Sequence, residues 1–450
     1  MLGGFLMSTI LIKNAEIVTM NKEEAIFRGD LFIENDRIAA IDRQLPDEGA
    51  DQVIDGTGRI VIPGFIQTHT HLCQTMFRGQ ADDLELLDWL RKKIWPLEAA
   101  HDEDSNYYSA MLGIGEMIQS GTTSIVDMET VRHTNSAFEA IAESGLRALS
   151  GKVMMDKGED LPHTLKEETS QSIQESVDLL EKWHNHDNGR IRYAFCPRFV
   201  ISCTEELLTE VRDLASLYNV NIHTHAAENR SEIELIEQQT GMRNVVYMDK
   251  IGLTGPNLIL AHCVWLDDEE RQIIHDRGVK VTHCPGSNLK LASGVAAIPE
   301  MLDQDVTIAL GADGAPCNNN LNMFNEMRLA ATIHKPEHGP LAMNARTVFR
   351  MATIDGAKVM GLEDEIGSLE VGKKADMAIL NLNDFHVNPY YGVDTISRIV
   401  YSARGSEVET TIIDGKIVME NRELKTIDKE IVLREANRSI QRLLKRAPLM

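Results

Sequence analysis

Short apolar runs alternate with amphipathic segments through the middle of this chain. Eight runs rich in Val, Ile and Leu predict buried strands, at residues 61–69, 122–128, 147–155, 191–197, 220–226, 257–264, 279–284 and 306–312. Helical periodicity fills the intervals, for example at Ser136–Ser144, Ser172–Trp183 and Glu205–Tyr218. This alternation predicts an α/β protein with a TIM-type (β/α)8 barrel over residues 63–360. An open doubly wound sheet is the alternative, but no glycine-rich nucleotide fingerprint follows the first strand.

Both ends of the chain lack this helical periodicity. Short strand-like segments alternate there with turn residues such as Asn35-Asp36 and Asp55-Gly56. We therefore expect a small β-sandwich domain built from residues 1–62 and 361–427, with the barrel inserted between its halves. Residues 428–450 complete the chain with a predicted charged amphipathic helix.

Composition narrows the classes of partner. The 450 residues carry a formal net charge of −24, which argues against nucleic acid because phosphate binding needs a basic face. No apolar stretch is long enough to span a membrane, and Met1 and Met7 are both candidate starts. Six scattered cysteines without a Cys-x-x-Cys motif indicate free thiols in a reducing compartment. We expect a cytoplasmic homo-oligomer that acts on a small molecule.

Ionisable side chains gather where the predicted strands end. His69 and His71 lie two residues apart and so share one face of the first strand. A bare His-x-His pair is more often structural than functional, but four later strand ends also carry a His or an Asp, namely His223 and His225, His262, His283, and Asp313. Barrel enzymes place their sites at these strand ends. Nitrogen and carboxylate ligands without a thiolate cluster suit Zn²⁺, with Fe²⁺ as the alternative.

Several longer motifs surround these residues. They are PGFIQTHTH at 63–71, HAAE at 225–228, AHC at 261–263, HCPGSNLKL at 283–291, LGADG at 310–314 and GSLEVGKKAD at 367–376. With these motifs the chain resembles the amidohydrolase superfamily over nearly its whole length. The resemblance is to the branch of aminohydrolases that act on nucleosides, purines, pterins and triazines.

The resemblance implies one divalent metal ion, bound by His69, His71, His225 and Asp313. Relatives with two metals carry a carboxylated Lys on the fourth strand. Residues 191–198 contain no Lys, so a single metal is expected.

The resemblance also implies a catalytic set of Glu228, His262 and Asp313. Asp313 would accept a proton from the attacking water, and Glu228 would protonate a ring nitrogen of the substrate. His262 would hold the water or the substrate and steady the developing oxyanion. His223, two residues before His225, is interpreted as structural.

Some residues favour a nucleoside as the substrate. Trp89 and Glu98 stand where deaminases of 5′-modified adenosines contact the nucleoside, the Glu gripping the ribose hydroxyls. A core Trp and a solvated Glu remain alternatives for these two positions. This resemblance favours deamination of 5′-deoxyadenosine, 5′-methylthioadenosine or adenosine.

Other residues favour a free oxopurine. Gln74 and Arg198 resemble positions of guanine deaminases, in which the Arg holds a purine carbonyl.

Lys152 stands where S-adenosylhomocysteine deaminases carry an Arg for the substrate carboxylate. His283 is a further predicted substrate contact, beside Glu228 and His262. Guanine, 8-oxoguanine or pterin deamination, triazine hydrolysis and a metal-free structural role stay open as alternatives.

Overall fold

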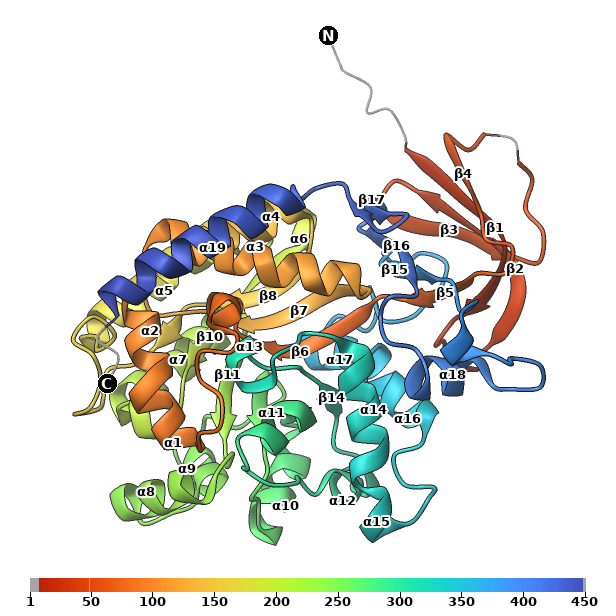
Figure 1. The fold of residues 1–450 in the computed structure, drawn as a ribbon. Helices are drawn as coiled ribbons and strands as arrows, with labels where there is room; N and C mark the ends of the chain where they lie inside the picture. Colours follow the sequence, from red (N-terminus) through yellow and green to blue (C-terminus); the bar gives the residue numbers. More distant parts are fainter. Residues whose placement is uncertain (1–7, 48, 448–450) are drawn as a thin grey trace.

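Eight parallel strands form a barrel in the computed structural model, which describes residues 8–47 and 49–447. In spatial order they are β6 (Phe65–Thr70), β7 (Thr122–Met128), β8 (Arg147–Gly151), β10 (Ile191–Pro197), β11 (Asn221–Ala226), β12 (Leu258–His262), β13 (Lys280–His283) and β14 (Ile308–Leu310). A parallel bridge between Thr70 and Asp313 joins the last strand's end to the first. The predicted barrel is therefore confirmed (Figure 1). Met1 and Met7 lie outside the described residues.

Helices cover the outside of the barrel. The main ones are α3 (Glu103–Gln119), α4 (Thr134–Ser144), α5 (Thr169–Trp183), α7 (Glu205–Tyr218), α8 (Arg230–Thr240), α9 (Asn244–Lys250), α10 (Asp268–Arg277), α12 (Ile298–Asp303), α14 (Met323–Ile333), α16 (Ala345–Met351) and α17 (Ile354–Met360). Helix α7 shows why the sequence forms them. The Thr204 side chain caps its start, Asn219 ends it in a left-handed conformation, and Leu207, Leu208 and Val211 are buried on one face.

Shorter helices lie in the loops, mostly above the carboxyl ends of the strands. They are η1 (Leu72–Phe77), α1 (Leu86–Trp89), the π-helix η2 (Leu90–Ile94), α2 (Trp95–Ala99), η3 (Val200–Ser202), α11 (Pro285–Lys290) and α13 (Ala315–Asn318). Three others lie elsewhere, α6 (His186–Gly189), α15 (Lys335–His338) and η4 (Phe385–Val387). The C-terminal helix α19 (Lys429–Arg446) contacts α3, where Ser439 donates a hydrogen bond to Asp104 at 2.8 Å.

The first predicted strand, 61–69, is two strands in the structure. β5 (Ile60–Pro63) belongs to the accessory sheet and β6 to the barrel, with Gly64 between them. A Cβ atom on Gly64 would lie 2.1 Å from the Thr123 side chain, so only glycine fits this crossing. The third predicted strand is also divided, because β9 (Val153–Met154) follows β8 after a break at Lys152.

The two chain ends combine into one nine-stranded sheet. Its strands are β1 (Thr9–Val18), β2 (Ile26–Glu34), β3 (Arg37–Asp42), β4 (Gln52–Asp55), β5, β15 (Met377–Leu380), β16 (Val408–Ile413), β17 (Lys416–Glu420) and β18 (Glu423–Leu424). Most neighbours are antiparallel, but β1 pairs in parallel with β4 and β5. The sheet encloses its own apolar cluster, which includes Ile12, Ile33, Val61 and Met377. Helix α18 (Thr395–Tyr401) lies beside it (Figure 1).

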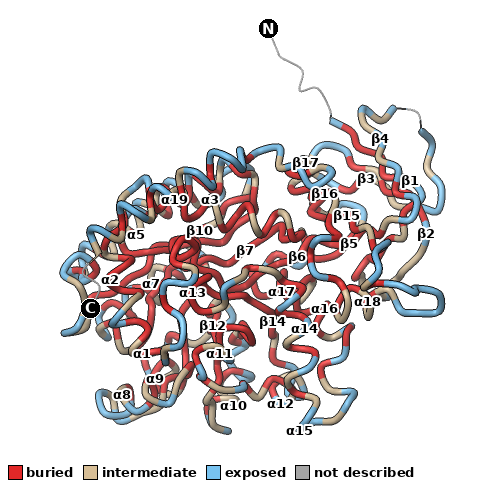
Figure 2. The backbone as a smooth tube through the Cα atoms, in the orientation of Figure 1, coloured by how far each residue is buried: buried red, intermediate tan, exposed pale blue. Residues whose placement is uncertain are grey.

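Burial is continuous through the barrel strands and the inner faces of the helices (Figure 2). Phe65 anchors this core, with Phe324 and Phe349 edge-on at ring-centroid distances of 5.1 and 6.0 Å. All six cysteines are buried and unpaired, which confirms the predicted free thiols. None of the helices in the described part of the chain combines the length and the apolarity needed to cross a membrane.

A buried ion pair joins the barrel to the accessory sheet. Arg147 at the start of β8 donates two hydrogen bonds to Asp376, at 2.6 and 3.0 Å, and a third to Asp414 at 3.0 Å. Asp376 also accepts the backbone N–H of Asp414 at 2.7 Å. Because Arg147 and Asp376 are buried and hydrogen-bonded to each other, loss of one of them leaves an uncompensated charge at the domain interface.

Replacing this arginine should destabilise the whole protein. Arg147→Met leaves Asp376 buried without its guanidinium and should lower the free energy of unfolding by about 3–5 kcal/mol. Urea unfolding followed by circular dichroism measures the change. Arg192→Met is the control, because its partner Glu365 is partly exposed and the loss should stay within about 1 kcal/mol. Equal losses in the two variants would contradict a stabilising role for the buried pair of Arg147 and Asp376.

Candidate active site

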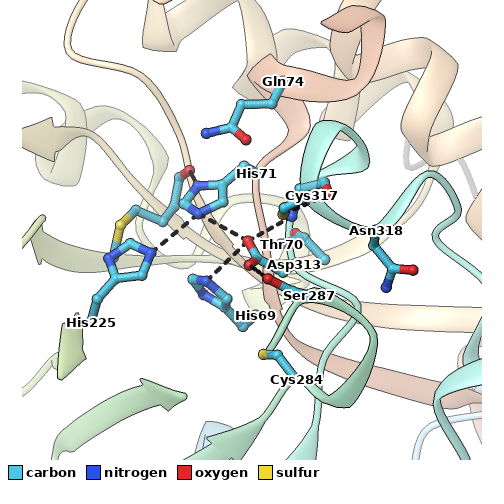
Figure 3. Close-up of polar contacts among 12 residues, drawn as sticks. His69, Thr70, His71, Gln74, His225, Cys284, Ser287, Asp313, Cys317 and Asn318 are labelled. Atoms are coloured by element: carbon cyan, nitrogen blue, oxygen red, sulfur yellow. Dashed lines mark hydrogen bonds and ion pairs between the residues drawn. The ribbon is translucent and has the colours of Figure 1, made fainter. Parts of the chain in front are cut away.

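Three histidines from two barrel strands meet at the carboxyl end of the barrel. His69 and His71 come from the end of β6, and His225 comes from β11 (Figure 3). One nitrogen of each ring lies within 4.8 Å of the corresponding nitrogens of the other two. The His-x-His spacing therefore places both rings on one face, as the strand periodicity predicted.

Backbone carbonyl groups fix the protonation of two of these rings. Nδ1 of His71 lies 2.6 Å from the carbonyl oxygen of Met128, and Nδ1 of His225 lies 2.8 Å from that of Arg198. A carbonyl oxygen only accepts, so each Nδ1 carries the proton and each Nε2 keeps a free lone pair. Burial lowers the pKa of His71 to about 3, which keeps this ring neutral at pH 7.

His223 fixes the third ring in the same way. Its Nδ1 donates to the carbonyl oxygen of Ile259 at 3.2 Å, so its Nε2 accepts from Nδ1 of His69 at 2.7 Å. Nε2 of His69 is left buried without a hydrogen-bond partner. His223 is thus structural in its contacts, but it sets the tautomer of a neighbouring candidate ligand.

Asp313 faces the histidines from the end of β14. Its Oδ1 lies 3.4 Å from Nε2 of both His69 and His71, and Ser287 donates to its Oδ2 at 2.6 Å (Figure 3). The backbone N–H of Gly314 also donates to Oδ1, at 2.6 Å. The φ angle of Asp313 is 64°, a left-handed conformation that costs roughly 1–3 kcal/mol in a non-glycine residue. The surrounding structure therefore holds this carboxylate in a strained position.

His262 and Glu228 form the adjacent part of the site. Nδ1 of His262 donates to the side-chain oxygen of Asn288 at 2.9 Å, which turns Nε2 toward Glu228 at 3.6 Å and Asp313 at 3.8 Å. Burial lowers the pKa of His262 to about 4, so Nε2 is a free acceptor. Like His69, this ring keeps Nε2 buried without a hydrogen-bond partner.

Glu228 is a buried carboxyl group that tends to keep its proton. Burial, and then the negative charges of Asp313 and Glu232, raise its pKa well above the ordinary value for a Glu. Glu232 accepts the backbone N–H of Glu228 at 2.8 Å and so fixes the turn that carries it. A protonated carboxyl group beside an unprotonated imidazole is a typical acid–base pair.

A second polar group lies across the loops after β6 and β10. Arg198 donates to both oxygens of Glu98, at 2.6 and 3.1 Å, and Gln74 donates to Glu98 at 2.8 Å. All three side chains are buried. A Cβ atom on Gly314 would lie 2.3 Å from Oε1 of Gln74, so this group directly adjoins the Asp313 turn.

The other predicted substrate contacts have different surroundings. Trp89 is buried in the apolar cluster of the 86–100 segment, and its ring N–H has no partner. Lys152 forms a buried ion pair with Glu167 at 2.5 Å. The ring of His283 packs against that of His334, with centroids 5.6 Å apart. Within the part of the chain that the structure describes, neither Lys152 nor His283 makes a hydrogen bond or ion pair with the histidine cluster.

Sequence reasoning assigned no role to three residues that orient the site. These are Ser287, Asn288 and Glu232, which bind Asp313, His262 and the backbone of Glu228. Ser287 and Asn288 lie in the HCPGSNLKL motif, so the motif was the available signal. Glu232 lies one helical turn after Glu228, a spacing that also occurs on any solvated helix.

The three free Nε2 atoms and the Asp313 carboxylate fit a divalent metal ion. Nε2 of His71 and Nε2 of His225 are 3.3 Å apart, and the derived tautomers leave no proton between them. Two lone pairs at that distance repel unless a cation lies between them. Neutral imidazoles and a carboxylate are a typical zinc donor set.

Comparison with known proteins agrees with this arrangement. The chain is 42% identical over 437 residues to a 5′-deoxyadenosine deaminase of Methanobrevibacter smithii, covering 97% of this chain and 98% of the relative. It is 43% identical over 412 residues to a 5-methylthioadenosine/S-adenosylhomocysteine deaminase of Thermococcus kodakarensis, covering 91% and 94%. A crystal structure of an adenosine deaminase from Xanthomonas campestris with bound zinc superimposes with a TM-score of 0.90 and 30% identity, covering 97% and 99%.

The sequence also matches the characteristic pattern of the Amidohydrolase family over residues 60–418, which span the whole barrel and the accessory strands β5, β15 and β16. The resemblance carried by the strand-end motifs is thereby confirmed, and the chain belongs to the amidohydrolase family.

Proposed function

We propose that this protein is a metal-dependent aminohydrolase that releases ammonia from an adenosine-type nucleoside. The observation that carries this proposal is the position of the buried Glu228 carboxyl group, 3.6 Å from His262, which lies 3.8 Å from Asp313 at the edge of the histidine cluster. This set combines a metal-binding site with a proton donor, and hydrolysis of an aromatic C–N bond needs both. The names of the compared deaminases support the same class of reaction.

His69, His71, His225 and Asp313 would hold the metal. We propose a single Zn²⁺, with Fe²⁺ as the alternative, because β10 offers no lysine for a second ion. A divalent cation at this place supplies the Lewis acidity that makes water nucleophilic near neutral pH. The carbonyl groups behind the rings would keep the ligand nitrogens unprotonated and correctly aimed.

The remaining residues would move protons and position the substrate. Asp313 would accept the proton of the attacking water, because its carboxylate lies at the histidine cluster, with Oδ1 3.4 Å from Nε2 of both His69 and His71. Glu228 protonates the ring nitrogen next to the carbon under attack, and His262 holds the oxygen that adds there. The amine would take up the proton held by Asp313 and leave as ammonia. The added hydroxyl would return its proton to Glu228, so that a carbonyl group remains on the ring.

We propose 5′-deoxyadenosine or 5′-methylthioadenosine as the substrate. The two compared sequence relatives carry these names, and Glu98 and Trp89 line the same end of the barrel as the histidine cluster. Arg198 supports guanine or another oxopurine as the second candidate, because a buried guanidinium can bind a purine carbonyl. The acidic net charge supports the absence of a nucleic-acid partner, while homo-oligomer formation stays a prediction.

Removal of one imidazole ligand should release the metal. His225→Ala deletes a neutral nitrogen donor and should lower both the metal content and ammonia release to near background, while the barrel stays folded. Elemental analysis of the purified protein and circular dichroism measure these effects. His334→Ala is the matched control, since this buried histidine lies outside the ligand cluster. Full metal occupancy in His225→Ala would refute the ligand assignment.

Loss of the proton on residue 228 should separate chemistry from metal binding. Glu228→Gln keeps the shape but cannot transfer the proton, so kcat should fall by roughly 10²–10⁴-fold. Metal content should stay at the wild-type level. Glu270→Gln alters another buried carboxyl group, which caps α10 away from the site, and should keep kcat. Near-normal turnover by Glu228→Gln would remove this residue from the mechanism.

An ammonia-release screen decides between the two substrate classes. We expect the highest kcat/KM for 5′-deoxyadenosine or 5′-methylthioadenosine, and much lower values for guanine, 8-oxoguanine, pterins and melamine. The ribose is the reason, because Glu98 gains hydrogen bonds only from substrates that carry hydroxyl groups. Guanine turnover far above that of every nucleoside would establish the oxopurine reading instead.

A further inference from the structure

Glu98 and Arg198 were predicted to serve rival substrates, a ribose and a purine carbonyl, yet the structure pairs them with each other. Both guanidinium NH2 groups bind the carboxylate, at 2.6 and 3.1 Å, and both side chains are at least 98% buried. A bidentate pair of this kind fixes the plane as well as the position of the carboxylate. Arg198 thus acts on Glu98 before any substrate enters.

The hydrogen-bond capacity of Glu98 is almost used up. Its Oε1 accepts from Arg198 and from Gln74, and its Oε2 accepts from Arg198. An ionised carboxylate offers about four acceptor sites, so roughly one remains. A ribose diol brings two donors. One of the present bonds must therefore break before both hydroxyls can bind.

Gln74 is the donor that can leave. Its bond to Glu98 is single and uncharged on the donor side, whereas the bond from Arg198 is bidentate and links two charges. Oε1 of Gln74 is buried without a hydrogen-bond partner. A hydrogen bond from the substrate to this oxygen would offset the loss of the bond between Gln74 and Glu98. Arg198 would stay paired with Glu98 throughout.

Arg198 is also held rigidly by its own backbone. Its N–H donates to Met154 at 3.3 Å, and its carbonyl oxygen accepts from Nδ1 of His225 at 2.8 Å and from Thr224 at 3.2 Å. The residue that fixes the tautomer of His225 with its backbone thus fixes Glu98 with its side chain. Through Arg198, the position of the Glu98 carboxylate is thus coupled to that of the His225 ring.

Resting on the proposed nucleoside substrate, we propose that Arg198 is a positioning residue for ribose recognition. It holds the Glu98 carboxylate oriented toward the two ribose hydroxyls, and it does not itself contact the purine ring. Gln74 occupies one acceptor site of Glu98 in the free enzyme and is displaced when the diol binds.

The test compares two substrates that differ only in the diol. With 5′-deoxyadenosine, Arg198→Met should raise KM by roughly 10–100-fold and change kcat by less than about threefold, because charge-assisted bonds to the ribose are lost. With the analogue that has hydrogens in place of both hydroxyls, KM should equal that of wild type. Arg198→Lys keeps the positive charge but cannot form the bidentate pair with Glu98. Its KM for 5′-deoxyadenosine should therefore rise less than that of Arg198→Met.

Two further variants identify the cause. Glu98→Gln should give the same selective rise in KM, and the double variant with Arg198→Met should be no worse than either single variant, because both act on one contact. Arg192→Met removes a guanidinium that pairs with the partly exposed Glu365, leaves the fold stable, and should leave the ratio of the two KM values unchanged.

Each contrary result has one meaning. An equal rise in KM for both analogues in Arg198→Met would overturn the positioning role and indicate a general distortion. Preferred turnover of guanine that disappears in Arg198→Met would overturn it in favour of direct contact with a purine carbonyl. If the metal-loaded wild type releases ammonia from no nucleoside, the proposed function fails and the ribose role fails with it.

Discussion

This site depends on one constraint: Nδ1 of each candidate ligand histidine is held in a hydrogen bond. The carbonyl oxygens of Met128 and Arg198 accept hydrogen bonds from Nδ1 of His71 and His225, and that of Ile259 accepts one from His223, which in turn accepts from His69. A ring cannot change tautomer here without losing a buried hydrogen bond. The three lone pairs at the centre are therefore a property of the barrel backbone, which makes the donor set available before a cation arrives.

Backbone strain at the strand ends completes this arrangement. Ala227, His262 and Asp313 have φ angles of 51°, 73° and 64°. Conformations of this kind cost roughly 1–3 kcal/mol each in residues other than glycine, and they persist only where the surrounding packing imposes them. The tightly packed barrel around Phe65 supplies that rigidity. The packing energy of the core thus offsets the cost of these backbone conformations and keeps the site side chains in place.

The sequence predicted the bounds of strands and helices accurately where a turn or a cap flanks the apolar pattern at each end. It was less accurate where an apolar run passes from one element into the next. β7, β10 and α7 match the predicted residues because turns or caps flank each apolar pattern. The predicted strand 61–69 was wrong because its apolar run continues through Gly64 from one sheet into another. Periodicity likewise brought the histidines together, since strand ends share a rim. Periodicity did not predict the ion pair between Glu98 and Arg198, because the sequence does not indicate which of two distant charged residues will meet in the fold.

The order of strands in the accessory sheet has a consequence for biosynthesis. β5 pairs with β1 near the beginning of the chain and with β15 near its end. During translation the first strands must wait for the whole barrel sequence, on the order of tens of seconds at normal elongation rates. Throughout that interval the nascent chain presents β5 as an unpaired edge, which is a template for intermolecular pairing. The side of Ile60–Pro63 that faces β15 in the folded protein therefore stays open to intermolecular pairing until the C-terminal strands are made.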